Sequence, residues 1–138
     1  MKRNGRIGTA ATILAGVLAC PGLGACAGGG SSGPTRPARI SHIVFFKLED
    51  PSQRDALLAD CDRLLPAIPG VVSYAAGRHL DVGRNTVDGD YDLGLYIGFE
   101  TERDYAVYVD HPNHTELVGS WRDRLAWLRV HDVLDESE

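Results

Sequence analysis

The pattern of apolar and polar positions predicts four β-strands. Strands are indicated where β-branched and aromatic residues cluster, or where apolar residues recur at every second position. The clearest example is the third, in which large apolar side chains alternate with positions such as Asp92 and Gly94. The four predicted strands are residues 39–48, 71–76, 91–99 and 126–134.

A first helix is predicted between the first two strands. Pro51 suits a first helical turn, and Asp50 can cap the free backbone N–H groups of that turn. Pro69 and Gly70 end the helical pattern. Apolar residues three and four positions apart give the helix one buried face, made of Leu57, Leu58, Cys61, Leu64, Leu65 and Ile68.

A second helical region, interrupted once, is predicted between the third and fourth strands. Thr101 is a good N-cap for a helix over residues 102–109. Pro112 disfavours helical geometry at the residue before it. The helix is therefore expected to break near Asp110 and to resume over residues 113–125.

The order of these elements, β-α-β-β-α-β, predicts an α+β fold of the ferredoxin-like sandwich type. In that arrangement the helices cover one face of the sheet and leave the other open. The first strand has Val44 and Phe46 on one face and Ile43 and Phe45 on the other, so the open face is also apolar. A second sheet would bury it. We therefore expect a homodimer whose two sheets form a dimeric α+β barrel.

The beginning of the chain predicts export. Three basic residues precede a mostly apolar run at residues 7–18, and small residues follow. This is the pattern of a signal peptide, here residues 1–25. The apolar run is too short for a permanent membrane span, which needs about 20 residues.

A cysteine at the end of this segment predicts lipid anchoring. Residues 23–26 (LGAC) resemble a bacterial lipobox, which makes Cys26 the candidate lipidation site. Cys20 is a second, less suitable candidate, and cleavage without lipidation or an uncleaved anchor are the alternatives. Residues 26–39, rich in Gly, Ser and Pro, are expected to form a flexible tether between the lipid and a domain over residues 40–136. The expected location is the cell envelope, in the periplasm or on the outer face of the membrane.

Charge and motif content exclude several functions. Beyond residue 25 the chain has 11 Lys and Arg against 19 Asp and Glu, a net charge of −8, so we expect no nucleic-acid partner, since such a partner requires a basic face. The 138 residues contain no Gly-rich phosphate loop after a strand and no serine nucleophile motif. We expect no cofactor. Cys61, the one cysteine left in the domain, is expected to be a buried small hydrophobe.

The domain resembles the Dabb family, the stress-responsive A/B barrels, over residues 39–136. The resemblance implies a dimeric barrel with a pocket between sheet and helices in each subunit. It rests on several short stretches in a fixed order, which are residues 42–48 (HIVFFKL), 68–71 (IPGV), 91–93 (YDL), 99–101 (FET) and 108–114 (YVDHPNH).

The same resemblance implies candidate site residues. A plant branch of the family closes polyketide chains by a cofactor-free aldol condensation, with a Tyr and a His at the positions of Tyr108 and His114. A further pocket His of that branch matches His42. Another pocket His of that branch stands where this chain has Leu93, so the sequence departs there from the pattern of the cyclase. His111, in the same motif, is a further candidate for the pocket.

The chemistry of these residues leaves three functions open. His114 can accept a proton near neutral pH, and the Tyr108 hydroxyl can donate to a developing oxyanion. The preferred hypothesis is a pocket that binds a small apolar or aromatic molecule. A cofactor-free lyase, cyclase or monooxygenase-like enzyme is the first alternative. The second is a structural, stress-protective dimer in which the His-Pro-x-His motif only builds the helix break.

A metal site is a separate and less specific alternative. His111 and His114, with Asp110 or Glu116, could supply ligands. Two His residues three positions apart, without a longer motif, do not define a zinc site. The acidic run at residues 88–92 lacks the glycine of a calcium loop, because Leu93 stands at that position. We therefore assign no metal ligands.

Overall fold

One antiparallel sheet forms the framework of the computed structural model, which describes residues 35–137. Its strands lie in the order β2-β3-β1-β4, so β1 and β3 are central and β4 is an edge strand. Each of the three neighbouring pairs is antiparallel. The strands are β1 (Ile40–Leu48), β2 (Ser73–Gly77), β3 (Leu93–Phe99) and β4 (Leu125–Leu134).

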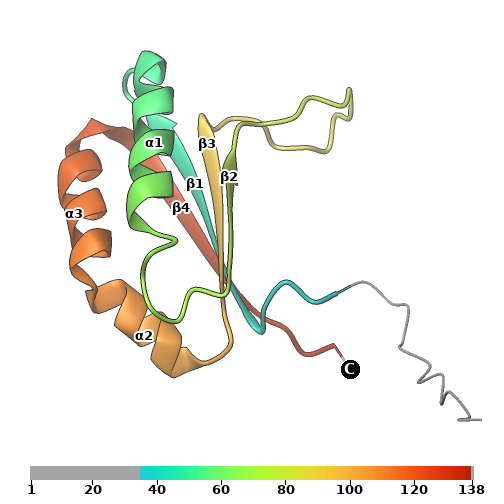
Figure 1. Cartoon of the computed structure of the whole chain (residues 1–138). Coiled ribbons are helices and arrows are strands. Elements are labelled where there is room, and N and C mark those ends of the chain that lie inside the picture. The colour runs from blue at the N-terminus through green and yellow to red at the C-terminus, as the bar shows by residue number, and fades with distance from the viewer. Residues whose placement is uncertain (1–34, 138) are drawn as a thin grey trace, which may run out of the picture. The chain divides into compact units, whose positions relative to one another are not determined.

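Three helices lie on one face of this sheet (Figure 1). They are α1 (Arg54–Leu64), α2 (Glu102–Asp110) and α3 (Pro112–Trp121), and short 3-10 turns at Pro51–Gln53 and Arg122–Arg124 flank α1 and α3. The element order and the sheet order confirm the predicted ferredoxin-like α+β sandwich.

The predicted start of the second helix is confirmed, whereas the predicted cap of the first helix opens a 3-10 turn, which α1 follows without a side-chain cap of its own. The Asp50 carboxylate accepts a hydrogen bond from the Ser52 backbone N–H at 3.0 Å, and Pro51 opens the turn. The Thr101 hydroxyl oxygen accepts from the Asp104 backbone N–H at 3.1 Å. Each cap satisfies an N–H group that has no partner within its helix.

The predicted break between α2 and α3 is also confirmed, at His111. This residue is extended, with φ −69° and ψ 140°, and Pro112 begins α3. The Asn113 backbone N–H donates to Nδ1 of His111 at 3.1 Å. The Asn113 side-chain amide donates to the Leu64 carbonyl at 2.9 Å and so ties the start of α3 to the end of α1.

The two faces of the sheet differ in burial. Along β1, side chains that face the helices are buried, and those between them, such as Ile43 and Phe45, are only half-buried. The core lies between sheet and helices and contains Leu57, Cys61 and Leu65 of the first helical region at less than 1% exposure. No residue among 35–137 covers the opposite face with a further layer (Figure 1).

Some boundaries differ from those predicted. β3 begins at Leu93 rather than at Tyr91, because its regular pairing with β1 ends at the pair of Leu93 and Phe46. Asp92 also bonds to β1, but out of this register: its side chain accepts from the Leu48 N–H at 2.8 Å, and its own N–H donates to the Phe46 carbonyl at 2.8 Å. β2 is assigned from Ser73, although Val72 already donates to the Gly98 carbonyl at 3.0 Å.

The predicted signal peptide (1–25) and Cys26 lie outside the described residues, as does the tether up to residue 34. No helix within residues 35–137 is long and apolar enough to cross a membrane. The expectation for Cys61 is confirmed: its thiol is fully buried, and burial raises the pKa of that thiol to about 12.

Candidate functional site

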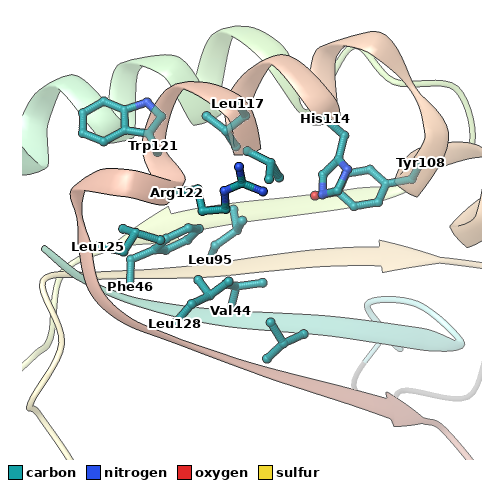
Figure 2. A pocket seen from close by; sticks show the side chains of 12 residues that line it. Val44, Phe46, Leu95, Tyr108, His114, Leu117, Trp121, Arg122, Leu125 and Leu128 are labelled. Atoms are coloured by element: carbon teal, nitrogen blue, oxygen red, sulfur yellow. The ribbon is translucent and has the colours of Figure 1, made fainter.

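An apolar pocket lies between α3 and the helix-facing side of the sheet (Figure 2). Its volume is about 160 Å³, and it is open to solvent on one side. Its walls come from β1, β3, the end of α2, α3 and β4. The residues that line it are Val44, Phe46, Leu95, Tyr108, His114, Leu117, Val118, Trp121, Arg122, Leu125, Leu128 and Val130.

The pocket exists because β4 extends beyond the cover of the helices. Leu128 and Val130 pair with Phe46 and Val44 of β1, so their side chains point toward the helix layer. Yet Leu128 is 48% exposed and Val130 is 46% exposed, whereas their β1 partners are buried. The edge strand thus forms one apolar wall of a groove whose opposite wall is α3.

Tyr108 closes one end of the pocket. Its side chain, near the C-terminal end of α2, is only 2% exposed and packs against the rings of Phe99 and His114 at 5.2 Å and 4.6 Å between centroids. Its hydroxyl has no hydrogen-bond partner among residues 35–137 and is not sealed off, so it faces the pocket. Burial raises the pKa of Tyr108, which keeps the hydroxyl protonated and able to donate.

His114 lies beside Tyr108, on the first turn of α3 (Figure 2). Its Nδ1 lies 2.9 Å from the Val109 carbonyl oxygen, which can only accept, so Nδ1 carries the proton. Nε2 is then a free acceptor. Burial lowers the pKa of His114, against the opposing effect of the Val109 carbonyl, and thus favours the neutral imidazole at pH 7. A donor and an acceptor therefore lie together at this end of the pocket.

His42 stands behind Tyr108 and does not line the pocket. It is 7% exposed, on the helix-facing side of β1, with its ring 5.7 Å from that of Tyr108. Its Nδ1 lies 2.7 Å from a carboxylate oxygen of Asp132 on β4 and 3.0 Å from the Tyr105 hydroxyl of α2. The Tyr105 hydroxyl also donates to Asp132 at 3.1 Å. This cluster links β1, β4 and α2.

Two other predicted site residues lie away from the pocket lining. His111 uses Nδ1 to accept the Asn113 N–H, which is the structural role considered for the His-Pro-x-His motif. Leu93 is fully buried in the core. Glu116, a candidate metal ligand, pairs with Arg63 at 3.1 Å. Among residues 35–137, no group of three or more His, Cys, Asp or Glu side chains is arranged to hold a metal ion.

Sequence reasoning missed two features of this region. Arg122 follows the last residue of α3 and lines the pocket mouth, although the helical pattern gave no reason to place it there. Asp132 was missed as the partner of His42, 90 residues earlier in the chain. Asp132 is, however, the one polar residue of β4 on the face that carries Leu128 and Val130, which is a signal that could have revealed it.

Comparisons with known proteins agree with this architecture. The profile of the Stress Responsive A/B Barrel Domain (Dabb) family matches residues 40–135. A dimeric ferredoxin-like protein of unknown function from Thermobifida fusca YX is 27% identical, with a TM-score of 0.59, over 70% of this chain and 90% of that one. A Dabb family protein with a ferredoxin-like fold from Mesorhizobium loti is 25% identical, with a TM-score of 0.60, over 71% and 97%.

A hydroxynitrile lyase from Passiflora edulis shares the fold at 19% identity, with a TM-score of 0.62, over 75% of this chain and 99% of that one. No curated protein matches the chain. The family profile covers more than half of the sequence, and it begins with β1 and ends just after β4, so that it contains every strand and helix described above. The chain therefore belongs to the stress-responsive A/B barrel family.

Proposed function

We propose that this protein is an exported, lipid-anchored stress-responsive A/B barrel protein that binds a small apolar or aromatic molecule between α3 and the sheet. The observation that carries the proposal is the Tyr108 hydroxyl, which belongs to a side chain only 2% exposed, faces the pocket and has no partner among residues 35–137. A hydroxyl that is open to a pocket and has no partner in the protein is available to bind a ligand. A bound molecule with an oxygen or nitrogen at this end would satisfy it.

The size and lining of the pocket favour a small, mostly apolar molecule. A dry apolar cavity of about 150 Å³ is known to accommodate benzene. The pocket here is of similar volume, about 160 Å³, and ten of its twelve lining residues are apolar or aromatic. Polar groups are confined to Tyr108 and His114 at one end and Arg122 at the mouth. Few polar groups in an apolar cavity are typical of small-molecule sites.

The test is native mass spectrometry of residues 34–138, purified from the cells that make the protein. These residues form a compact unit of their own. The matched relatives are covered over 90% and 97% of their lengths, so this domain makes up almost all of those chains and folds without further parts. We expect a discrete added mass that denaturation releases as a small organic molecule.

A matched pair of variants assigns that mass to the pocket. Val118→Phe places a larger side chain in the pocket wall on α3, and we expect it to abolish the added mass. Val107→Phe is the control, because Val107 is equally exposed on α2, at 43% against 42%, and does not line the pocket. Equal retention of the mass by both variants, or no added mass in any sample, would oppose the proposal and favour a structural, ligand-free dimer.

Export and anchoring are tested through the two N-terminal cysteines. With Cys26→Ser we expect loss of radiolabelled palmitate incorporation and release of the protein from the membrane fraction. Cys20→Ser is the control and should keep both. The lipobox pattern of residues 23–26 supports this part of the proposal. Palmitate labelling that survives Cys26→Ser would contradict it.

A homodimer is the third part of the proposal. It is supported by the sheet face that carries Ile43 and Phe45, which no further layer covers among the described residues, and by relatives described as dimeric. Two sheets packed face to face would bury these side chains and form a dimeric α+β barrel.

A second candidate function is cofactor-free acid–base catalysis in the same pocket. It is favoured by one observation, the fixed tautomer of His114, which leaves Nε2 as an acceptor beside the Tyr108 hydroxyl. Such a pair can remove a proton from a substrate and stabilise the resulting oxyanion. An enzyme would convert the recovered molecule in a reaction that His114→Gln abolishes, whereas a binding protein would return it unchanged.

A further inference from the structure

We infer that the molecule held in this pocket is an organic acid with an apolar body, whose carboxylate lies against Arg122 at the mouth while its body fills the groove toward Tyr108. The inference rests on the proposed ligand-binding function and adds the chemical class of the ligand. It is carried by Arg122, by the absence of carboxylates from the lining, and by the free Tyr108 hydroxyl in the same pocket.

Arg122 is the one cation among the twelve residues that line the pocket, and none of the twelve is Asp or Glu. Its side chain extends from the end of α3 over the pocket, between the helix and the strands (Figure 2). Its fork of N–H donors matches the two oxygens of a carboxylate. A ligand that enters the groove therefore meets a cation at the mouth and no competing anion in the walls.

Arg122 is free to bind such a group. Its one ion pair among the described residues joins its Nε to Asp123 at 3.7 Å, between side chains that are 76% and 92% exposed. An exposed pair at this distance is weak and easily exchanged. By contrast, Arg124 stacks on the outer side of Trp121, with 4.9 Å between the guanidinium carbon and the ring centroid, and does not line the pocket.

The net negative charge of the whole domain makes a cation at the pocket a stronger indication of an acidic ligand. Beyond residue 25 the net charge is −8, so the average field of the protein repels acids. A pocket for a neutral molecule would need no cation. Arg122 lies in a lining that has no carboxylate. It therefore attracts an acid locally, and this attraction offsets the repulsion by the net negative charge of the domain.

The groups that line the pocket then recognise different parts of one ligand. The aliphatic and aromatic walls, including Phe46, Leu95 and Leu117, bury an apolar body about the size of one ring. The Tyr108 hydroxyl and Nε2 of His114 offer a donor and an acceptor to a polar substituent of that body. Monocyclic aromatic acids and short-chain fatty acids fit these requirements.

Matched pairs of acids and amides test the inference by calorimetry on residues 34–138 after any bound molecule has been removed. The probes are benzoate and benzamide, phenylacetate and phenylacetamide, and hexanoate and hexanamide. The members of each pair share shape and apolar area, so their difference reports the charge alone. We expect each acid to bind at least about fivefold more tightly than its amide, as a charge-assisted hydrogen bond would provide.

Variants assign this preference to Arg122. Arg122→Gln should abolish the preference of each acid over its amide, and Arg122→Lys should restore part of it. Arg103→Gln is the matched control: it removes the same charge from the exposed surface of α2, away from the pocket, and should keep the preference.

Two outcomes would overturn the inference, and they separate it from the proposed function. If amides bind as tightly as acids, and Val118→Phe weakens both, the pocket binds small molecules but does not select acids. If no probe binds at millimolar concentration, and Val118→Phe does not remove the added mass from the purified protein, the proposed binding function fails together with the inference.

Discussion

At the level of single residues, Tyr108 carries a polar group that contributes nothing to the stability of the fold described here. Its ring is part of the core, but its hydroxyl has no partner among residues 35–137. Because this hydroxyl is open to the pocket, it can donate to a bound molecule without first giving up a bond to the protein. A few such polar groups in an apolar pocket are typical of small-molecule sites.

The change Tyr108→Phe separates the contribution of the hydroxyl to stability from its contribution to ligand binding. Because the hydroxyl is unpaired, we expect the free energy of unfolding of the ligand-free protein to change by less than about 0.5 kcal/mol, while affinity for the pocket molecule falls about tenfold. Urea denaturation and ligand titration measure the two effects. Tyr105→Phe is the control, since it removes hydrogen bonds to His42 and Asp132 and should destabilise by about 1–2 kcal/mol. Equal destabilisation by both changes would contradict this view of Tyr108.

The lowered pKa of His114 predicts how the stability of the fold depends on pH. Burial lowers its pKa below the ordinary value of 6.5, so the unfolded chain binds this proton more tightly than the folded protein does. Its contribution to stability is therefore fully present above pH 6.5 and is lost as the pH falls from 6.5 toward the lowered pKa. We expect Tm to fall over this range, and His114→Gln to make the decline shallower.

Thermal unfolding across this pH range checks the expectation. His79→Gln is the control, because His79 lies in the loop between β2 and β3, outside the pocket. This change should leave the slope of Tm against pH as it is in the wild type. A slope unaffected by His114→Gln would show that the His114 imidazole is not held neutral in the folded protein.

The sequence predicted part of the site at this scale. It predicted that Tyr108 and His114 would share one cavity, and both line the pocket. It placed His42 on the correct face of β1, but only the three-dimensional structure shows that Asp132 and Tyr105 hold its ring behind Tyr108. The contribution of Arg122 depends on how far β4 extends past the helices, which a one-dimensional pattern does not contain.

At the level of elements, the position of α3 determines the shape of the pocket. The helix is held to α1 at both ends: Asn113 donates to the Leu64 carbonyl at 2.9 Å, and the Trp121 indole N–H donates to Asp60 at 3.0 Å. Arg63 joins Asp60 at 2.9 Å, and this hydrogen bond and the one from Trp121 lower the pKa of that carboxyl. These contacts keep α3 over α1 and away from β4, which leaves the groove open.

Asn113→Ala tests this arrangement. The change leaves the Leu64 carbonyl without its donor, and we expect a destabilisation of about 1 kcal/mol, with weaker ligand binding as α3 becomes less well fixed. Denaturant unfolding and ligand titration measure both. Asn85→Ala, in the exposed loop between β2 and β3, should leave both unchanged. Loss of stability without loss of affinity would indicate that this contact does not shape the pocket.

Most helices and strands could be predicted because a few neighbouring residues determine where each one begins or ends. The caps at Asp50 and Thr101 and the break before Pro112 each follow from a few neighbouring residues. The predicted start of β3 was two residues too early, because the regular pairing with β1 ends at Leu93. Asp92 bonds to β1 out of this register, a contact across 44 positions of the chain that the alternating pattern does not contain.

At the level of the whole molecule, the open sheet face is the main unpaired feature. Phe45 packs on Tyr91 at 4.7 Å between ring centroids, and Ile43 lies beside it on β1. An apolar sheet face without a covering layer favours association with a second copy. The apolar residues on both faces of β1 already predicted this from sequence, although the geometry of the partner sheet could not be predicted.

Phe45→Asp tests the proposed dimer. A charge at the centre of a buried sheet interface is strongly unfavourable, so we expect light scattering to show a shift from dimer to monomer at micromolar concentration. Val107→Asp, which introduces the same charge on the exposed surface of α2, is the control and should remain dimeric. A wild-type protein that is already monomeric, or a Phe45→Asp variant that stays dimeric, would contradict face-to-face packing.

The most direct test of ligand binding is a crystal structure of the protein as it is purified from its own cells. We expect electron density for a small molecule in the groove between α3 and β4, with one of its polar atoms within hydrogen-bond distance of the Tyr108 hydroxyl. An empty or water-filled groove, in a protein whose native mass shows nothing bound, would contradict this expectation and leave the structural dimer as the function of this fold.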